Sequence, residues 1–147
     1  MGLEDIVYRL GIATTAGLLM GIDRELRGIA AGLRTHALVA LSSALITVSA
    51  MILYNELSST TNIDPLRVVQ GLAQAVGFVS AGAVFFAKGD VHNLTTAANI
   101  WLAAALGIAA GMGQTALVIT GIGFGALILT IVRLAEAFLP GNQKAGD

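Results

Sequence analysis

Five long apolar segments limit what this chain can fold into. They cover roughly residues 6–22, 35–54, 68–87, 96–112 and 114–138. A helix needs about 20 mostly apolar residues to cross a lipid bilayer, and the shorter first and fourth segments suit a thinned or oligomeric site. The segments are too long for strands and do not alternate in polarity. We therefore predict an all-α fold: a polytopic membrane helix bundle of about five transmembrane helices.

The composition supports a membrane location. Apolar residues make up 56% of the chain and charged residues 12%, whereas soluble domains average about 45–50% and about 25%. Eighteen Gly suit closely packed membrane helices. The net charge of -1 offers no basic face, so no nucleic-acid partner is expected. No Cys is present, which excludes disulfides and thiolate metal sites. The lipid bilayer is the first partner implied.

The segments indicate a single transmembrane domain over residues 1–140 and a short cytoplasmic tail at 141–147. If the N-terminus is outside, the cytoplasmic side holds six of the eight Lys and Arg. These six are Arg24, Arg27, Arg34, Lys88, Arg133 and Lys144. The positive-inside rule therefore predicts a multi-pass protein with its N-terminus outside and its C-terminus in the cytoplasm. Five spans make a thin bundle, so a homo-oligomer is also expected.

A weak internal repeat relates the two halves of the chain. GLRTHALVALSSAL (32–45) aligns with NLTTAANIWLAAAL (93–106) at an offset of 61 residues. In both copies an apolar segment and a Gly-containing loop precede L-x-T and the next apolar segment. Both copies start on the same side under the predicted topology. This indicates a parallel repeat of two helical hairpins, not an inverted one.

Charged residues gather between the first and second segments, in GIDRELRGIAAGLRTHALVAL (21–41). On a helix, Asp23 would face Arg27 four residues later. The first interpretation is that these charges only fix topology. The second is a polar pocket on the cytoplasmic side, in which acids and arginines neutralise each other or a ligand. The candidate cluster comprises Asp23, Arg24, Glu25, Arg34, Thr35, His36, Thr95 and Thr96.

Two threonines are predicted to begin helices on this same side. Thr35 and Thr96 can each act as an N-cap by accepting a hydrogen bond from a backbone N–H. The positive ends of the two helices would then favour anions, either Asp23 and Glu25 or an external carboxylate or phosphate. Asp64 before Pro65 is a similar helix start.

Polar residues inside the segments are few. Gln70, Gln74 and Asn99 are the intramembrane amides, and they either bond a neighbouring helix or line a hydrated path. Gly17/Gly21 and Gly107/Gly111 are GxxxG pairs compatible with close helix contacts. His36 and His92 match no metal-binding spacing, so no metal site is assigned. No catalytic motif and no cofactor signature appears, so no catalytic residues are assigned and an enzyme is not expected.

Three blocks resemble the motifs of the MgtC/SapB family of membrane proteins: residues 21–41, GFVSAGAVFFAKG (77–89) and NLTTAANIWLAAALGIAAG (93–111). Two positions depart from the family pattern, which often has Arg after the third span and Arg-Gly before L-T-T. Here these places read Ala87-Lys88 and His92-Asn93. The matching positions are Gly21, Asp23, Arg24, Glu25, Gly32, Leu33, Arg34, Thr35, His36, Gly77, Phe78, Ala81, Gly82, Leu94, Thr95, Thr96, Ala97, Ala98 and Trp101.

The resemblance implies a bacterial inner-membrane protein, here in a short form that lacks the C-terminal soluble domain of many members. It implies a non-enzymatic regulator that acts through membrane-protein partners, with the F-type ATP synthase as the candidate. It also implies a link to low-Mg²⁺ adaptation and virulence. The alternative is a small ion or solute transporter or channel, which the parallel repeat and the intramembrane amides would suit.

Overall fold

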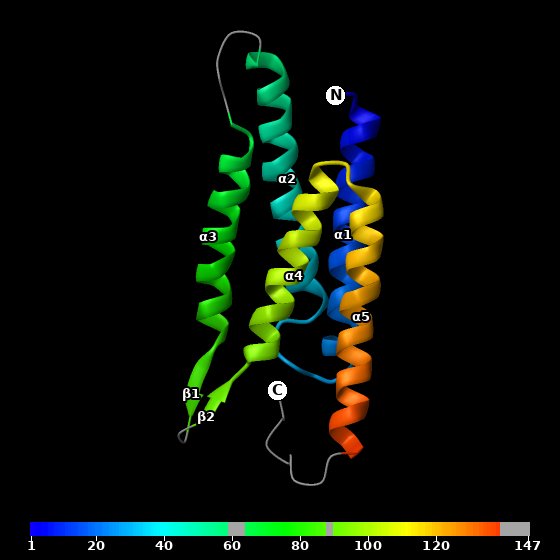
Figure 1. The fold of residues 1–147 in the computed structure, drawn as a ribbon, viewed down its shortest axis with the longest axis vertical. Helices are drawn as coiled ribbons and strands as arrows, with labels where there is room; N and C mark the ends of the chain where they lie inside the picture. The colour runs from blue at the N-terminus through cyan, green and yellow to red at the C-terminus, as the bar shows by residue number, and fades with distance from the viewer. Residues whose placement is uncertain (59–63, 88–89, 139–147) are drawn as a thin grey trace.

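Five helices and one short hairpin form the computed structural model, which describes residues 1–58, 64–87 and 90–138. The elements are α1 (Leu3–Leu26), α2 (Leu33–Leu57), α3 (Leu66–Ala83), β1 (Phe85–Ala87), β2 (Asp90–His92), α4 (Leu94–Gly111) and α5 (Thr115–Phe138). Successive helices run in alternate directions along one axis (Figure 1). The predicted all-α bundle of five helices is confirmed; the predicted tail at 141–147 lies outside the described residues.

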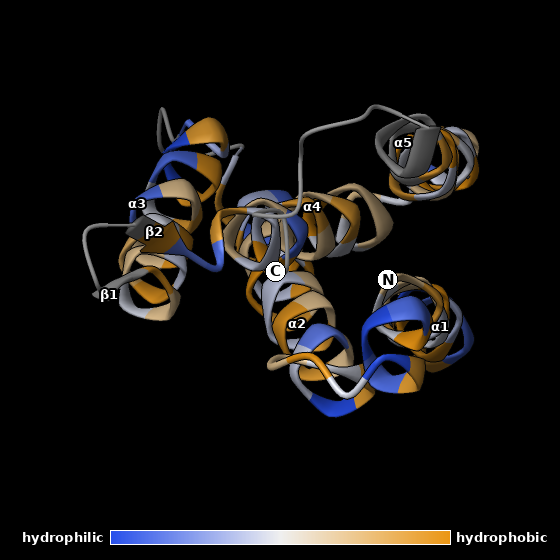
Figure 2. Ribbon diagram, turned by 90° about the horizontal axis from the view of Figure 1, so that it is seen from below, coloured by the Kyte–Doolittle hydropathy of each residue, from blue (hydrophilic) through white to orange (hydrophobic). Residues whose placement is uncertain are grey.

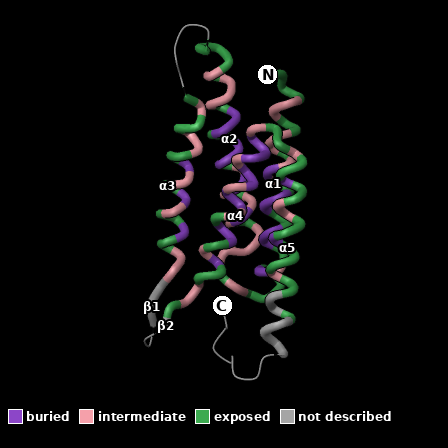
Figure 3. Tube along the Cα trace, in the orientation of Figure 1, coloured by how far each residue is buried: buried purple, intermediate pink, exposed green. Residues whose placement is uncertain are grey.

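Helix α4 is the centre of the bundle, because it contacts each of the other four helices. Viewed along the bundle, α3 lies on one side of α2 and α4, while α1 and α5 lie on the other (Figure 2). Buried positions follow the same arrangement and concentrate on α1, α2 and α4, whereas α3 and α5 are largely exposed (Figure 3). An apolar helix exposed on its outer side suits a lipid surround.

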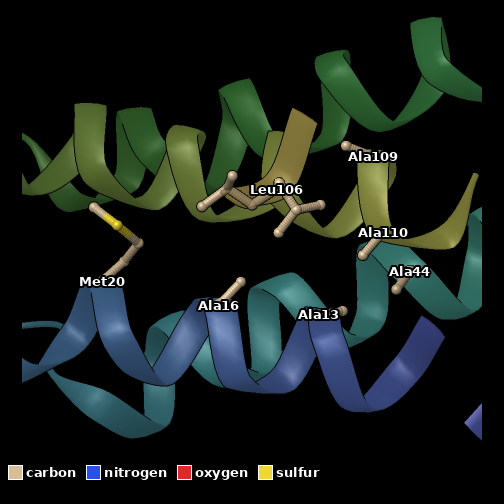
Figure 4. Packing of buried hydrophobic residues seen from close by; sticks show 8 residues of the cluster. Ala13, Ala16, Met20, Ala44, Leu106, Ala109 and Ala110 are labelled. Atoms are coloured by element: carbon tan, nitrogen blue, oxygen red, sulfur yellow. The ribbon is translucent and has the colours of Figure 1, made fainter. Parts of the chain in front are cut away.

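The hydrophobic core is built mainly of small side chains, with a few larger ones between them (Figure 4). Small residues let helix backbones approach closely, which favours van der Waals packing where lipid removes the hydrophobic driving force. The core comprises Ala13, Ala16, Met20, Ala44, Leu106, Ala109, Ala110 and Val118.

Helix α1 approaches α2 through the first GxxxG pair. A Cβ placed on Gly17 would lie 2.7 Å from the Cα of Ala37, and a Cβ on Gly21 would lie 2.7 Å from the Cα of Leu33. Carbon atoms in contact normally stay about 3.5–4.0 Å apart. The crossing of these two helices therefore requires glycine at both positions.

Helix α4 approaches α2 through the second pair. A Cβ on Gly107 would lie 2.9 Å from the Cα of Ala40, and a Cβ on Gly111 would lie 2.7 Å from the Cβ of Thr47. The glycines of α1 and α4 thus bring both helices against α2. The close contacts anticipated for the two GxxxG pairs are present in the structure.

The end of the third segment differs from the prediction. The segment was expected to be helical to residue 87, but α3 ends at Ala83 and Phe85–Ala87 forms β1, antiparallel to β2 with Phe85 opposite His92. Asn93 follows β2 with a φ of 65°, a left-handed conformation that Gly and Asn adopt most readily. Its side-chain amide donates to the Ala83 carbonyl at 3.1 Å, which ties the end of α3 to the start of α4. This conformation explains how Asn93 can replace the Gly expected there.

Three helices are long and apolar enough to cross a membrane: α1, α2 and α4. The described apolar stretch of α5, Thr115–Ile131, is shorter, and α3 is not apolar enough to meet the same standard. α2 and α4 nevertheless run in the same direction (Figure 1), so the chain between them must cross back. We therefore treat α3 as a membrane-crossing helix.

The parallel repeat has a structural counterpart. Leu33 and Leu94, which the 61-residue offset aligns, are the first residues of α2 and α4. The two helical hairpins, α1–α2 and α3–α4, run in the same sense (Figure 1). The helix start expected at Asp64 lies one residue later: Pro65 is the N-cap of α3, and the Asp64 carboxylate accepts a hydrogen bond of 2.9 Å from the Leu66 N–H.

Candidate functional site

Four buried polar residues meet where α1, α2 and α4 come together, and we term this set the polar junction. They are Arg24 on α1, His36 on α2, and Thr96 and Asn99 on α4, with exposed fractions of 3%, 0%, 1% and 4%. All four lie in the half of the bundle that includes the α1–α2 loop. Polar groups are rarely placed so deeply without a defined role in packing or function.

Arg24 makes the contacts of the junction that lie next to the α1–α2 loop. Its guanidinium donates through Nη2 to the hydroxyl oxygen of Thr96 and through Nε to the carbonyl of Ala30, at 3.3 Å. Its own carbonyl accepts from the backbone N–H groups of Arg27 and Ile29, at 3.2 and 3.0 Å. One residue thus fixes the α1–α2 loop and joins it to the first turn of α4.

Asn99 and His36 make the remaining polar contacts of the junction. The Asn99 amide nitrogen donates to the Met20 carbonyl at 3.1 Å, which links α4 to the backbone of α1. His36 Nδ1 lies 2.9 Å from the carbonyl of Gly32, one turn earlier on α2. The hydrogen bonds of the junction thus link α1 to α4, and His36 adds a buried polar side chain from α2.

Glu25 holds the start of α2 beside the junction. Its Oε2 accepts a hydrogen bond of 3.0 Å from the N–H of Leu33, the first residue of the helix. A carboxylate is favoured there by the partial positive charge of a helix N-terminus. A Cβ on Gly32 would overlap this carboxylate, so a larger residue there would displace the Glu25 side chain. The prediction that an acid of the first loop occupies a helix N-terminus is met for Glu25 at α2.

The predicted threonine caps are wrong. The N-cap positions are Gly32 for α2 and Asn93 for α4, and neither side chain makes a capping hydrogen bond. Thr35 and Thr96 are each the third residue of their helix. The Thr96 hydroxyl instead points to Arg24 and receives its hydrogen bond. The error has a physical cause: the Gly and Asn before each L-x-T already let the backbone turn, so each N-cap lies three residues earlier than predicted.

The other members of the predicted cluster lie away from the junction. Asp23 accepts two hydrogen bonds from Arg27, at 3.0 and 2.8 Å, so the expected i, i+4 pair is present at the surface. Arg34 and Thr95 are exposed, and Thr35 is half-buried. The cluster thus divides into a buried group and a surface group, which spacing alone did not separate.

The intramembrane amides also divide. Asn99 belongs to the junction, whereas Gln70 and Gln74 are exposed on α3. Arg9 is a polar contact that was not among the candidates: its guanidinium donates to the Gly111 carbonyl at 2.8 Å and pairs with Asp5 at 3.0 Å. The i, i+4 spacing of Asp5 and Arg9 is the feature of the sequence that could have predicted this pair.

In the described part of the chain, no group of three or more His, Asp or Glu is placed to hold a metal ion.

Replacing Glu25 with alanine is expected to lower the free energy of unfolding by about 0.5–1 kcal/mol, because the Leu33 N–H loses its acceptor at the start of α2. Asp23→Ala is the matched control: its pair with Arg27 is at the surface, so we expect a loss no greater than about 0.5 kcal/mol. Thermal unfolding in detergent micelles would compare them. A larger loss for Asp23→Ala would contradict the assigned role of Glu25.

Five helices around a buried polar junction define a polytopic α-helical membrane protein. The chain belongs to the MgtC family, because the model of that family matches residues 10–138.

The chain is also similar in sequence to several named proteins. The chain is 34% identical over 129 residues to the putative magnesium transporter YhiD of Escherichia coli K12, covering 86% of this chain and 60% of that protein. It is 39% identical over 112 residues to protein SapB of Bacillus subtilis, covering 74% and 48%. It is 35% identical over 108 residues to protein MgtC of Salmonella typhimurium, covering 74% and 44%. The chain therefore spans 60% or less of the length of these three relatives. No solved structure matches it.

Proposed function

We propose that this protein is a non-enzymatic regulator that acts by packing against other membrane proteins. The observation that carries the proposal is an exposed polar face on α3. Gln70, Gln74 and Ala81 are exposed there, and a Cβ on Gly77 would meet nothing within 4 Å. We term these four residues the Gln face.

The other side of α3 is already occupied. Leu72, Val76 and Ser80 are the buried residues of this helix, and Val76 packs in a cluster with Ile100 and Ala104 of α4. The Gln face follows a spacing of four, three and four residues, which keeps its members on one side of a helix. α3 therefore has one face bound within the bundle and a second face available to a partner.

The position of Gln74 supports a partner for α3 in a bilayer. Gln74 lies eight residues after Leu66, which at 1.5 Å per residue places it about 12 Å along the helix, near its middle. An amide exposed to hydrocarbon is costly, whereas an interhelical hydrogen bond there contributes about 1–2 kcal/mol. A neighbouring polypeptide, either a second copy or another membrane protein, would supply that bond.

The remaining parts of the proposal follow the family and the charge distribution. We place the protein in the bacterial inner membrane with its N-terminus outside, because the α1–α2 loop region holds Arg24, Arg27 and Arg34. The F-type ATP synthase is the partner that the family resemblance implies. The name of YhiD, putative magnesium transporter, supports a connection with Mg²⁺ supply.

A single cysteine on the Gln face should crosslink to a membrane partner. The chain has no cysteine of its own, so Ala81→Cys introduces a unique site, and Ser49→Cys on the exposed side of α2 is the control. In native membranes we expect a thiol crosslinker to give a defined adduct from Ala81→Cys only. Adding Gln70→Leu and Gln74→Leu should remove it, while Gln114→Leu, outside α3, should not.

The products of this experiment discriminate between partners. An adduct of twice the monomer mass indicates a second copy, and mass spectrometry of a mixed adduct identifies another protein, with ATP synthase subunits tested first. An adduct that persists in the Gln70→Leu, Gln74→Leu variant, or equal adducts from both cysteine sites, would refute the Gln face as the binding surface.

Transport is the second candidate, and the buried polar junction is the observation that favours it. Polar groups inside a bundle mark ion pathways in many membrane proteins. Saturable flux of Mg²⁺ into proteoliposomes that is lost on Asn99→Leu would replace the regulator proposal with this alternative.

A further inference from the structure

The polar junction contains a buried hydrogen-bond acceptor on His36. The Gly32 carbonyl near Nδ1 can only accept, so Nδ1 must carry the proton in that contact. In the neutral ring Nε2 is then an acceptor. Nε2 has no hydrogen-bond partner among the described residues, and the side chain is fully buried.

Asn99 presents a second acceptor of the same kind. The Met20 carbonyl can only accept, so the nitrogen of the Asn99 amide must face it. The amide oxygen Oδ1 consequently faces another direction. In the described part of the protein Oδ1 is buried and receives no hydrogen bond.

The residues that carry the two acceptors lie against the same short stretch of α1. Gly17 of α1 is against the backbone of His36, and Gly21 is against Leu33. Met20, to which Asn99 donates, lies between these two glycines in α1. His36 and Asn99 therefore approach one layer of α1 from α2 and α4. Each acceptor left without a donor in the interior would cost about 1–3 kcal/mol.

We propose that the polar junction binds one buried water molecule, which donates one O–H to His36 Nε2 and the other to Asn99 Oδ1. Water suits the site because both missing bonds need a donor, and buried waters typically make about three hydrogen bonds to such groups. Thr96 accepts from Arg24 and so keeps its own hydroxyl hydrogen, which can donate to the water oxygen.

A cation is the other ligand that two acceptors could attract, and Arg24 argues against it. The guanidinium donates to Thr96, three residues before Asn99 on α4, and Arg24 is buried. A second positive charge in this low-dielectric layer would be repelled. A neutral donor avoids that repulsion.

Solid-state NMR of the full chain in lipid bilayers tests the proposal directly. With ¹⁵N-labelled histidine the chain gives two histidine spin systems, and His92→Gln assigns the one from His36. We expect His36 to be protonated at Nδ1 only and to receive rapid magnetisation transfer from water. Asn99→Leu should reduce this transfer to background, whereas Ser49→Leu on the exposed side of α2 should leave it unchanged.

Four results would overturn the shared water. One is a wild-type His36 that is protonated at Nε2, and another is a wild-type His36 that receives no magnetisation transfer from water. Both are measured on the wild-type protein, so neither depends on whether Asn99→Leu folds. The third is a shift of the Nε2 resonance that saturates as Mg²⁺ is added, which would assign the site to a cation. Unchanged transfer in a folded Asn99→Leu variant would show that the two acceptors do not share a water.

Discussion

Gly107→Val is expected to lower the free energy of unfolding by about 3 kcal/mol, the upper end of the usual cost of overpacking. A Cβ at this position would lie 2.9 Å from both the carbonyl carbon and the Cα of Ala40, which are backbone atoms and cannot rotate away. α4 would have to move from α2, and α4 contacts every other helix. Thermal unfolding in micelles, with helix content measured in parallel, would report the loss.

Gly123→Val is the matched control for this prediction. Gly123 lies on α5, where a Cβ would meet nothing within 4 Å. Valine has a somewhat higher helix propensity than glycine, so the control should be neutral or slightly stabilising. Equal melting temperatures for the two variants would contradict the close crossing of α2 and α4.

Arg24→Met should also be strongly destabilising, by about 2–3 kcal/mol. The substitution removes the donors to Thr96 and to the Ala30 carbonyl while nearly preserving side-chain volume. Two hydrogen bonds from a charged donor are lost, and the α1–α2 loop is released from α4. Chemical unfolding in mixed micelles would give the free energy, and proteolysis of the loop at 27–32 would report its release.

Arg34→Met supplies the comparison, since it removes the same charge from an exposed position on α2. A surface change of this kind is expected to stay within about 0.5 kcal/mol. If both arginine variants behaved alike, Arg24 would act only as a topology signal and not as a support of the junction.

Much of the fold could be predicted because hydrophobic length is a direct physical requirement of a bilayer. The five helices, the two glycine pairs and the parallel hairpins all follow from the pattern of apolar and small residues. The end of α3 could not be predicted in this way, because Phe85 and Phe86 continue the apolar run while the chain turns back into a hairpin. Hydropathy cannot distinguish an apolar helix end from an apolar strand.

The site was predicted less well than the fold. Arg24, Glu25, His36 and Thr96 were all among the candidates, but the contact between Arg24 and Thr96 was not predicted. Thr96 was predicted to be the N-cap of a helix whose positive end would attract an anion. In the structure its hydroxyl oxygen accepts a hydrogen bond from a buried arginine of another helix. Contacts between α1 and α4 span about 70 residues and leave no periodic trace in the sequence.

The central place of α4 has a consequence for how the chain is made. Synthesis delivers α1 and α2 to the membrane well before residues 94–111, so the first hairpin must wait with Arg24 and His36 on an open side. That side closes only when α4 arrives with its glycines, Thr96 and Asn99. The interior of this protein is therefore completed late in biogenesis. A ribosome stalled before residue 94 would leave a hairpin whose polar side chains are not yet covered by α4.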